Sequence, residues 1–149
     1  MTYHSRIVAN PGYLQALGQA FYNFTYLEWT VIWTIVKLSP DGFGSVPKRE
    51  PARKIAKALT KAIDGTSPPL PNDLRRRLVK FDEAFREAIR VRNKLLHAHP
   101  YTTPTGEQQL MGASLKWPIE PVNAAAKLFE DAAITGNNIF HGDLAKARP

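Results

Sequence analysis

Residues 92–101, RNKLLHAHPY, hold the side chains of this chain that are best suited to chemistry on a phosphate. Arginine is permanently charged and presents a planar fork of donors that matches phosphate oxygens. Histidine titrates near neutral pH and can accept or donate a proton. If Arg92 and His97 contact one RNA phosphate, His97 could take the proton of the ribose 2′-hydroxyl while Arg92 stabilises the charge on phosphorus. Asn93 could orient a side chain or a water, and the reaction needs no metal.

The spacing of this pair places a condition on the site. Five helical residues turn the chain by about 500°, which leaves the side chains of Arg92 and His97 about 140° apart around the helix axis. They converge only if the helix distorts before Pro100, or if two chains combine their sites. A dimer packed around these helix ends would bring two arginines and two histidines into one cleft.

The element that must position Arg92 is a long helix that starts near Asn72 or Asp73, a good capping position. It should end around residues 97–99, because Pro100 disfavours helical geometry at the residue before it. Its apolar stripe is Leu74, Leu78, Phe81, Phe85, Ala88 or Ile89, then Arg92, then Leu95 and Leu96. Arg92 thus falls on or beside the inward face, where an arginine needs an anionic partner.

A long first helix is predicted from Asn10-Pro11 to a point before SPDGFGS. Its main stripe is Leu14, Leu17, Phe21, Phe24, Glu28, Val31, Ile32 and Ile35. Because Glu28 sits among apolar positions, it could pair with Arg92 inside the bundle, and such a structural ion pair competes with the catalytic interpretation. Four aromatic residues lie off the stripe: Tyr22, Tyr26, Trp29 and Trp33. They indicate either a surface for a partner chain, as in a homodimer, or a helix covered on all sides by its own fold.

The remaining elements complete an all-α domain. PARKIAKALTKAIDG predicts a short second helix, with Ile55, Ala58, Leu59, Ala62 and Ile63 on its apolar face. A turn at residues 103–106, TPTG, between two short extended pieces predicts a small hairpin. A last helix runs from about Pro121, with Val122, Ala125, Leu128, Phe129 and Ala132 inward, and the tail HGDLAKARP should fray. We expect a single domain over residues 1–149, a four- to five-helix bundle with a short loop or hairpin inserted after the third main helix.

The charge is concentrated in the middle of the chain. The net charge is +7, and residues 48–94 hold fourteen basic and six acidic side chains, so the remainder is close to neutral. This asymmetry indicates an anionic partner, with RNA the leading candidate, or a solvated basic face that maintains solubility. The residues expected to contact RNA are Arg53, Lys57, Lys61, Arg75, Arg76, Arg77, His99 and Tyr101.

Several classes of protein are disfavoured. The chain has no cysteine, which excludes disulfides and thiolate metal sites. His97 and His99 could ligate a metal on an extended segment, but no third ligand is near them in sequence, so we expect no metal and no cofactor. The start of the chain has no apolar run of signal-peptide length, and the segment YLEWTVIWTIVKL is too short to span a bilayer. A cytoplasmic protein is expected.

The segment RNKLLHAHP, at the end of a bundle helix that follows a basic helix, resembles the R-x4-6-H motif of the HEPN domains (higher eukaryotes and prokaryotes nucleotide-binding). Arg92 matches the motif arginine, Asn93 the polar residue after it, and His97 the motif histidine. One branch of the family has the form R-x4-H-x-Y with a modified tyrosine. Here Tyr101 follows His97 by four residues, and His99 takes that branch's tyrosine position.

The resemblance implies a metal-independent RNase of toxin–antitoxin or defence type that works as a dimer with a shared Arg/His cleft. An antitoxin protein would then be a further partner. A second hypothesis is the same fold acting as a non-catalytic module that binds RNA, a nucleotide or a protein. A third is a structural dimer in which Arg92 caps a buried acid.

Overall fold

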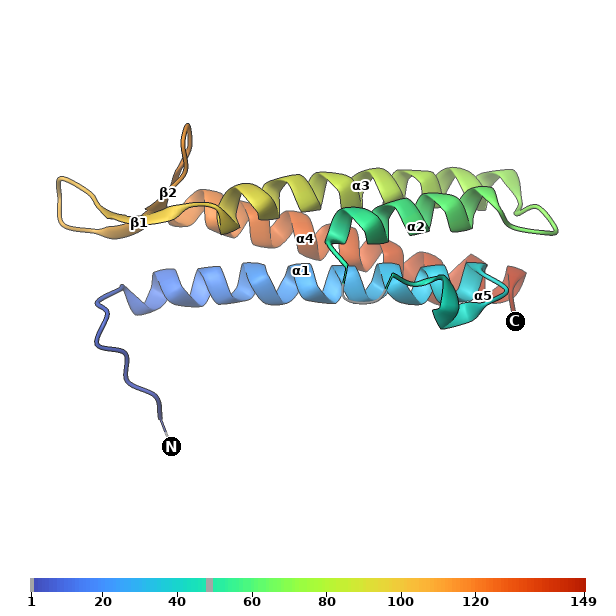
Figure 1. Cartoon of the computed structure of the whole chain (residues 1–149), viewed down its shortest axis with the longest axis horizontal. Helices are drawn as coiled ribbons and strands as arrows, with labels where there is room; N and C mark the ends of the chain where they lie inside the picture. The colour runs from blue at the N-terminus through green and yellow to red at the C-terminus, as the bar shows by residue number, and fades with distance from the viewer. Residues whose placement is uncertain (1, 48–49) are drawn as a thin grey trace.

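The computed structural model describes residues 2–47 and 50–149, and four long helices form an elongated bundle (Figure 1). Lys48 and Arg49, at the start of the basic region, lie outside the described residues. The four helices are α1 (Pro11–Leu38), α2 (Ala52–Asp64), α3 (Asn72–Leu96) and α4 (Ile119–Ile139). α2 and α4 each pack against both α1 and α3. The prediction of an all-α bundle is confirmed, and within the described ranges no helix has the length and apolarity needed to cross a bilayer.

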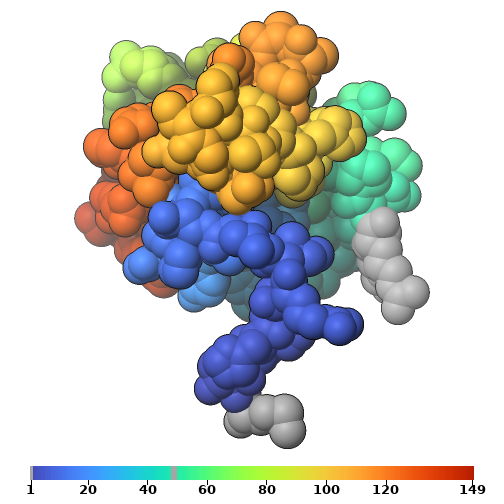
Figure 2. Space-filling view, turned by 90° about the vertical axis from the view of Figure 1, so that its left-hand side faces the viewer, coloured from blue at the N-terminus to red at the C-terminus, as the bar shows by residue number. Residues whose placement is uncertain are grey.

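A small antiparallel sheet follows α3 and lies at one end of the bundle (Figures 1 and 2). Its strands are β1 (His99–Thr102), β2 (Gln108–Met111) and β3 (Lys116–Trp117), in the order β1-β2-β3. The turn between β1 and β2 closes with a 2.9 Å hydrogen bond from the Gly106 amide to the Thr103 carbonyl, and Gly106 takes a φ of 88° that favours glycine. The predicted hairpin is confirmed. The two-residue β3 was not predicted.

α1 begins where expected, because Asn10 caps it through a 3.1 Å hydrogen bond from the Tyr13 amide to the Asn10 side chain. Its inward face, however, differs from the predicted stripe. Leu14 and Phe21 are 50% and 59% exposed, so this part of the prediction is wrong. The buried residues are Tyr13, Ala16, Ala20, Phe24, Leu27, Thr30, Val31, Thr34, Ile35 and Leu38. Small residues at Ala16 and Ala20 face the core and permit close packing, whereas the larger Leu14 and Phe21 lie on the other side.

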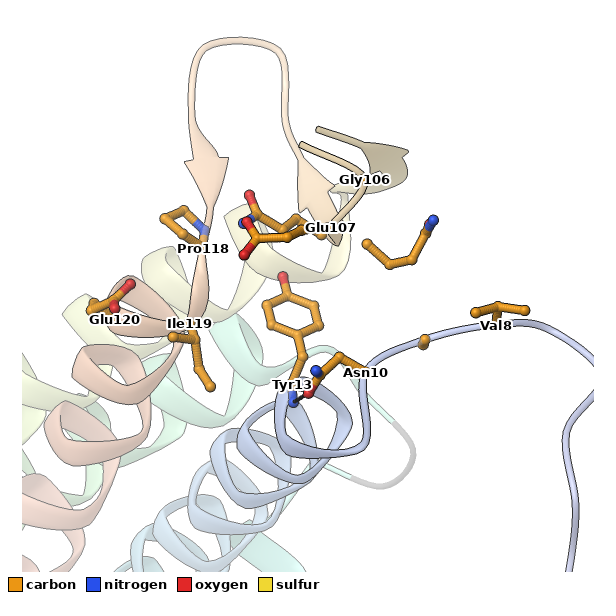
Figure 3. A pocket seen from close by; sticks show the side chains of 11 residues that line it. Val8, Asn10, Tyr13, Gly106, Glu107, Pro118, Ile119 and Glu120 are labelled. Carbon is orange, nitrogen blue, oxygen red and sulfur yellow. Dashed lines mark hydrogen bonds between the residues drawn. The ribbon is translucent and has the colours of Figure 1, made fainter. Parts of the chain in front are cut away.

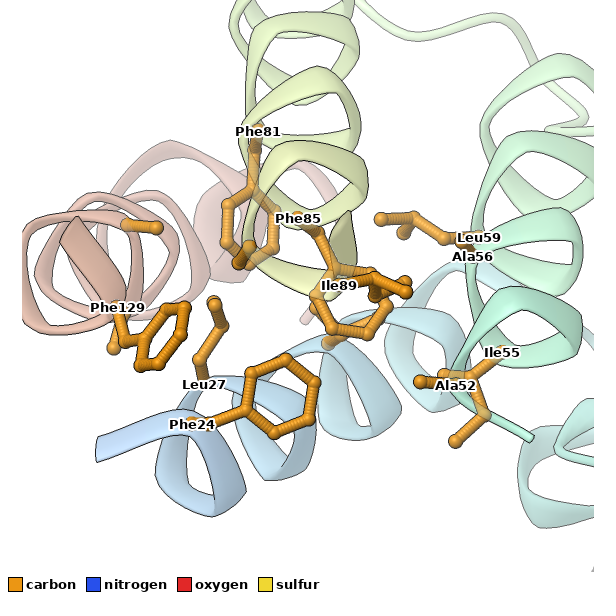
Figure 4. Close-up of a cluster of buried hydrophobic side chains, with 14 of the residues drawn as sticks. Phe24, Leu27, Ala52, Ile55, Ala56, Leu59, Phe81, Phe85, Ile89 and Phe129 are labelled. Atoms are coloured by element: carbon orange, nitrogen blue, oxygen red, sulfur yellow. The ribbon is translucent and has the colours of Figure 1, made fainter. Parts of the chain in front are cut away.

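The core joins all four helices, and buried phenylalanines from α1, α3 and α4 meet in it (Figure 4). The Phe24 ring of α1 lies 6.2 Å from that of Phe85 in α3 and 5.4 Å from that of Phe129 in α4. α3 buries the predicted apolar positions except Leu96, which is exposed at the helix end. α3 begins at Asn72, but Pro71 occupies the cap position, and none of the described side chains caps the helix.

The C-terminal tail is ordered against the bundle, so the prediction that it frays is wrong. Residues Phe140–Leu144 form the π-helical turn η2, and α5 (Ala145–Ala147) follows it. Leu144 is fully buried, and Arg148 donates to the carbonyls of Ser67 and Pro68 at 3.1 and 2.8 Å. A single apolar anchor and these backbone contacts hold a segment that its composition alone marks as loose. A short 3-10 turn, η1 (Gly42–Ser45), follows α1.

Candidate functional site

Arg92 is held on an aromatic surface. Its guanidinium carbon lies 4.6 Å from the centre of the Phe24 ring. Its Nε is buried and has no hydrogen-bond partner among the residues that the structure describes. A guanidinium over the face of a ring is attracted to the ring's electrons and forms no hydrogen bond with it, which leaves its N–H donors for an anion. The side chain is therefore positioned without an acidic partner.

A cavity of about 320 Å³ opens beside Arg92, and we call it the Arg92 cavity. Three helices meet there. Its lining consists of Glu28 from α1, residues 50–53 at the start of α2, and Ile89, Arg92 and Asn93 from α3. The predicted RNA-contacting residue Arg53 is thus brought to the same cavity as two of the three predicted catalytic residues.

Glu28 lies in the Arg92 cavity but forms no salt bridge with Arg92. No guanidinium or ammonium nitrogen of the described residues comes within the 4.0 Å salt-bridge distance of its carboxylate. Burial raises the pKa of the Glu28 carboxyl, and the charge of Arg92 opposes this rise only in part. The contact expected of a structural ion pair between Glu28 and Arg92 is therefore absent, although both residues line one cavity.

His97 opens into a different cavity, of about 580 Å³, which we call the His97 cavity. Its lining consists of Arg90, Asn93, Lys94 and His97 from α3, residues 112–115, and Trp117. His97 is the C-terminal cap of α3, and its backbone amide donates to the Asn93 carbonyl at 3.1 Å. Its side chain is exposed. α3 stays regular to Leu96, so the two side chains of one chain do not converge. Asn93 lines both cavities and lies between them.

The two residues of this segment that were predicted to contact RNA, His99 and Tyr101, lie apart from both cavities. His99 is exposed on β1, and Tyr101 lies on the same strand with the Lys116 ammonium 5.9 Å from its ring centre. Neither residue belongs to the lining of the Arg92 or His97 cavity. Across residues 2–47 and 50–149, no three histidine, cysteine, aspartate or glutamate side chains cluster in a way that could hold a metal ion.

The basic residues of α2 form an exposed row. Arg53, Lys57 and Lys61 are one helical turn apart, and none of them forms an ion pair with a described residue, whereas the neighbouring Lys54 pairs with Glu50 at 2.8 Å. We call Arg53, Lys57 and Lys61 the α2 basic row. Since Arg53 lines the Arg92 cavity, the row leads away from that cavity along the surface.

The three arginines at the start of α3 are differently placed. Arg75 pairs with Asp64 at 2.7 Å, and Arg76 pairs with Asp73. Arg77 lies between Asp73, at 3.3 Å, and Asp143. At 1.5 Å per residue this group is about 25 Å from Arg92 along the helix. The structure thus does not join the arginines to the Arg92 cavity, and their predicted contact with RNA stays a prediction.

Sequence reasoning missed a polar network that fixes α2 on α3. The buried Asp82 carboxylate accepts hydrogen bonds from the Thr60 hydroxyl at 2.5 Å and from Arg86 Nε at 3.1 Å. Arg86 also donates to Thr60, at 2.6 Å, and to the Ala56 carbonyl at 3.2 Å. By fixing α2, this network helps to hold the α2 basic row beside Arg92. The sequence signal that could have revealed this network is Asp82, an acidic residue directly after Phe81 of the apolar stripe.

Tyr13 fixes the sheet onto the bundle, another contact that the sequence did not reveal. Figure 3 shows its ring pointing from α1 toward the hairpin, inside a cavity of about 570 Å³. The Tyr13 hydroxyl donates to the Trp117 carbonyl at 2.6 Å and accepts from the Leu110 amide at 3.0 Å. Burial raises its pKa, and the amide hydrogen bond lowers it less. Because Trp117 lines the His97 cavity, Tyr13 supports one wall of that cavity.

One face of α1 exposes large aromatic residues to solvent. Tyr22, Tyr26, Trp29 and Trp33 are 64%, 47%, 53% and 38% exposed, and we call them the aromatic face. Trp29 and Trp33 pack edge to face, with 5.7 Å between ring centres. The alternative in which the fold covers α1 on all sides is wrong for the chain by itself.

Comparison of the chain with protein-family models, with curated proteins and with solved structures found no match. The resemblance to the HEPN motif therefore depends on the residues of the Arg92–His97 segment and on their helical context.

Proposed function

We propose that this chain is a metal-independent endoribonuclease of the HEPN type that acts in the cytoplasm as a homodimer. The observation that carries the proposal is the state of Arg92, a half-buried arginine that lines an open cavity and forms no salt bridge with any described residue. An arginine held in this way is preorganised for an anion, because no internal ion pair has to break first. The α2 basic row would guide the RNA backbone to it.

The reaction proposed is transesterification within the RNA. The ribose 2′-oxygen forms a bond to phosphorus, the bond from phosphorus to the 5′-oxygen breaks, and a 2′,3′-cyclic phosphate and a 5′-hydroxyl result. One proton leaves the 2′-hydroxyl and one is added to the 5′-oxygen. Arg92 stabilises the charge on the phosphate oxygens, His97 transfers a proton, and Asn93 orients groups between the two cavities.

The homodimer is proposed because Arg92 and His97 of one chain line different cavities. A second copy can bring its His97 to the Arg92 of the first, which restores the pair on a single phosphate. The aromatic face is the proposed contact between copies, because it exposes four large aromatic side chains and carries none of the basic residues of the middle of the chain. Light scattering at micromolar concentration should give the mass of a dimer, and a monomer would count against this arrangement.

The test of the activity uses wild-type protein and a pool of structured RNAs in EDTA. Cleavage should proceed with the chelator present and leave a 2′,3′-cyclic phosphate or its hydrolysis product. A 2′-deoxy substitution at the cut site should block cleavage at that bond. If the wild-type protein cleaves no RNA, the proposal fails.

The second candidate is a non-catalytic module of the same fold that binds RNA, a nucleotide or a protein such as an antitoxin. The separation of the Arg92 and His97 cavities within one chain favours it, because a chain acting alone would hold an anion at Arg92 without a histidine beside it. RNA binding by the wild-type protein without cleavage is the result that would select this candidate.

A further inference from the structure

Two carboxyl groups line the Arg92 cavity, and they differ in their surroundings. Glu50 is exposed and pairs with Lys54 at 2.8 Å. Glu28 is half-buried and, within the described part of the chain, has no ion-pair partner. A half-buried acid in an open cavity, without a fixed partner, is free to accept a proton from a bound molecule.

The described charged groups that face Glu28 are Arg92 from α3, and Arg53 and Glu50 at the start of α2. The two arginines suit a phosphate, because neither depends on Glu28 for neutralisation. Glu28 enters from α1, on another wall of the same cavity. Burial raises its pKa, so its carboxylate is a better proton acceptor than that of an ordinary glutamate.

We propose that Glu28 accepts the proton of the ribose 2′-hydroxyl when RNA is bound with its phosphate on Arg92. This assignment rests on the proposed endoribonuclease function and adds a catalytic residue to it. The 2′-oxygen bonds to phosphorus as its proton moves to a Glu28 carboxylate oxygen. His97 of the partner copy is left to donate the proton that the departing 5′-oxygen requires. Each proton thus has a source and an acceptor.

The test compares Glu28→Gln with the wild-type protein, and Glu130→Gln on the exposed surface of α4 is the matched control. Cleavage should fall by about a hundredfold or more in Glu28→Gln, as expected for loss of a general base. Affinity for a non-cleavable 2′-deoxy RNA should be unchanged or tighter, because one negative charge near the phosphate is removed. Glu130→Gln should cleave like the wild-type protein.

The pH profile gives a readout that a structural role would not move. In the wild-type protein the logarithm of the cleavage rate should rise with pH through the titration of Glu28. The residual activity of Glu28→Gln should lack this rise at acidic pH, the acidic limb of the profile. A profile that keeps the limb in Glu28→Gln would overturn the assignment.

The outcomes separate this inference from the function on which it rests. If the wild-type protein cleaves RNA and Glu28→Gln cleaves within threefold of it, only the assignment of Glu28 is overturned. If Glu28→Gln loses cleavage together with affinity for 2′-deoxy RNA, Glu28 shapes the site and is not the base. If the wild-type protein cleaves nothing, both proposals fall.

Discussion

The guanidinium of Arg92 lies over the ring of Phe24, with its carbon 4.6 Å from the ring centre, and makes no salt bridge with Glu28 in the same cavity. Phe24 is itself fixed in the core between Phe85 and Phe129. The arginine therefore stands on a rigid aromatic support, and its charge is left for an anion. A structural arginine in a bundle would be expected to meet its acid directly.

This arrangement predicts how Glu28 affects stability. Because burial raises the pKa of Glu28 above 4.5, the folded chain binds this proton more tightly than the unfolded chain. As pH rises from about the ordinary value through the raised one, ionisation of Glu28 should lower the free energy of unfolding. Glu28→Gln should remove this loss and raise Tm by a few degrees at pH 7 without RNA. Thermal unfolding of the wild-type protein and of Glu28→Gln between pH 4 and 8 measures this difference in Tm. A lower Tm for Glu28→Gln than for the wild-type protein at pH 7 would contradict the prediction and indicate a stabilising pair of Glu28 with Arg92.

A second prediction concerns the support of the sheet by Tyr13. Tyr13→Phe leaves the Trp117 carbonyl and the Leu110 amide without their shared partner, which should cost about 1–3 kcal/mol of stability. Urea denaturation of the variant measures this cost. Tyr3→Phe is the control, because Tyr3 is 87% exposed and should tolerate the change. Equal stability of the two variants would contradict the role given to the Tyr13 hydroxyl.

The close approach of α3 and α4 makes a third prediction. A Cβ added at Gly136 of α4 would collide with the ring of Phe81, which is fully buried in α3. Gly136→Ala should therefore destabilise the fold by about 1–3 kcal/mol, as overpacking does. Gly18→Ala is the matched control, since a Cβ at Gly18 in α1 meets no atom within 4 Å and should be neutral or stabilising. Denaturation midpoints that fall equally in both variants would argue against this packing.

The α2 basic row predicts a salt-dependent interaction with RNA. The double variant Lys57→Glu and Lys61→Glu should weaken RNA binding and lower the slope of log affinity against log salt by about one to two units. Fluorescence polarisation across a salt series measures both effects. Lys127→Glu is the control, because Lys127 lies on α4, outside the predicted RNA contacts, and pairs with Asp131 at 2.7 Å. Unchanged affinity in the double variant would assign these lysines to solubility.

The helices could be predicted because their signals are local. Asn10-Pro11 fixes the start of α1. α3 ends at Leu96, four residues before Pro100, which lies in β1 and disfavours helical geometry at His99. The inward face of α1 could not be predicted, since apolar residues cover both sides of that helix. Only packing within the bundle selects Ala16 and Ala20 for the core. The order of the tail likewise depends on distant contacts, such as that of Arg148 with the α2–α3 connection.

The candidate site was partly readable in the same way. The position of Arg92 beside the inward stripe follows from the spacing of residues along α3 alone, so it could be predicted. In the structure Arg92 is half-buried, as that position predicts. The roughly 140° between Arg92 and His97 follows from helix geometry, and the structure gives the two residues separate cavities. The placement of Arg92 over Phe24 and the position of Glu28 depend on how α1 meets α3, which spacing along one helix does not specify.

The central claim, that Arg92 and His97 of two copies act on one phosphate, is tested most directly by mixing inactive variants. Arg92→Ala and His97→Ala should each abolish RNA cleavage in EDTA. Unfolded and refolded together in equal amounts, they should recover about a quarter of the wild-type activity, because half of the dimers are mixed and each has one intact site of two. Cleavage that persists in His97→Ala alone, or no recovery in a mixture shown to form mixed dimers, would contradict the claim.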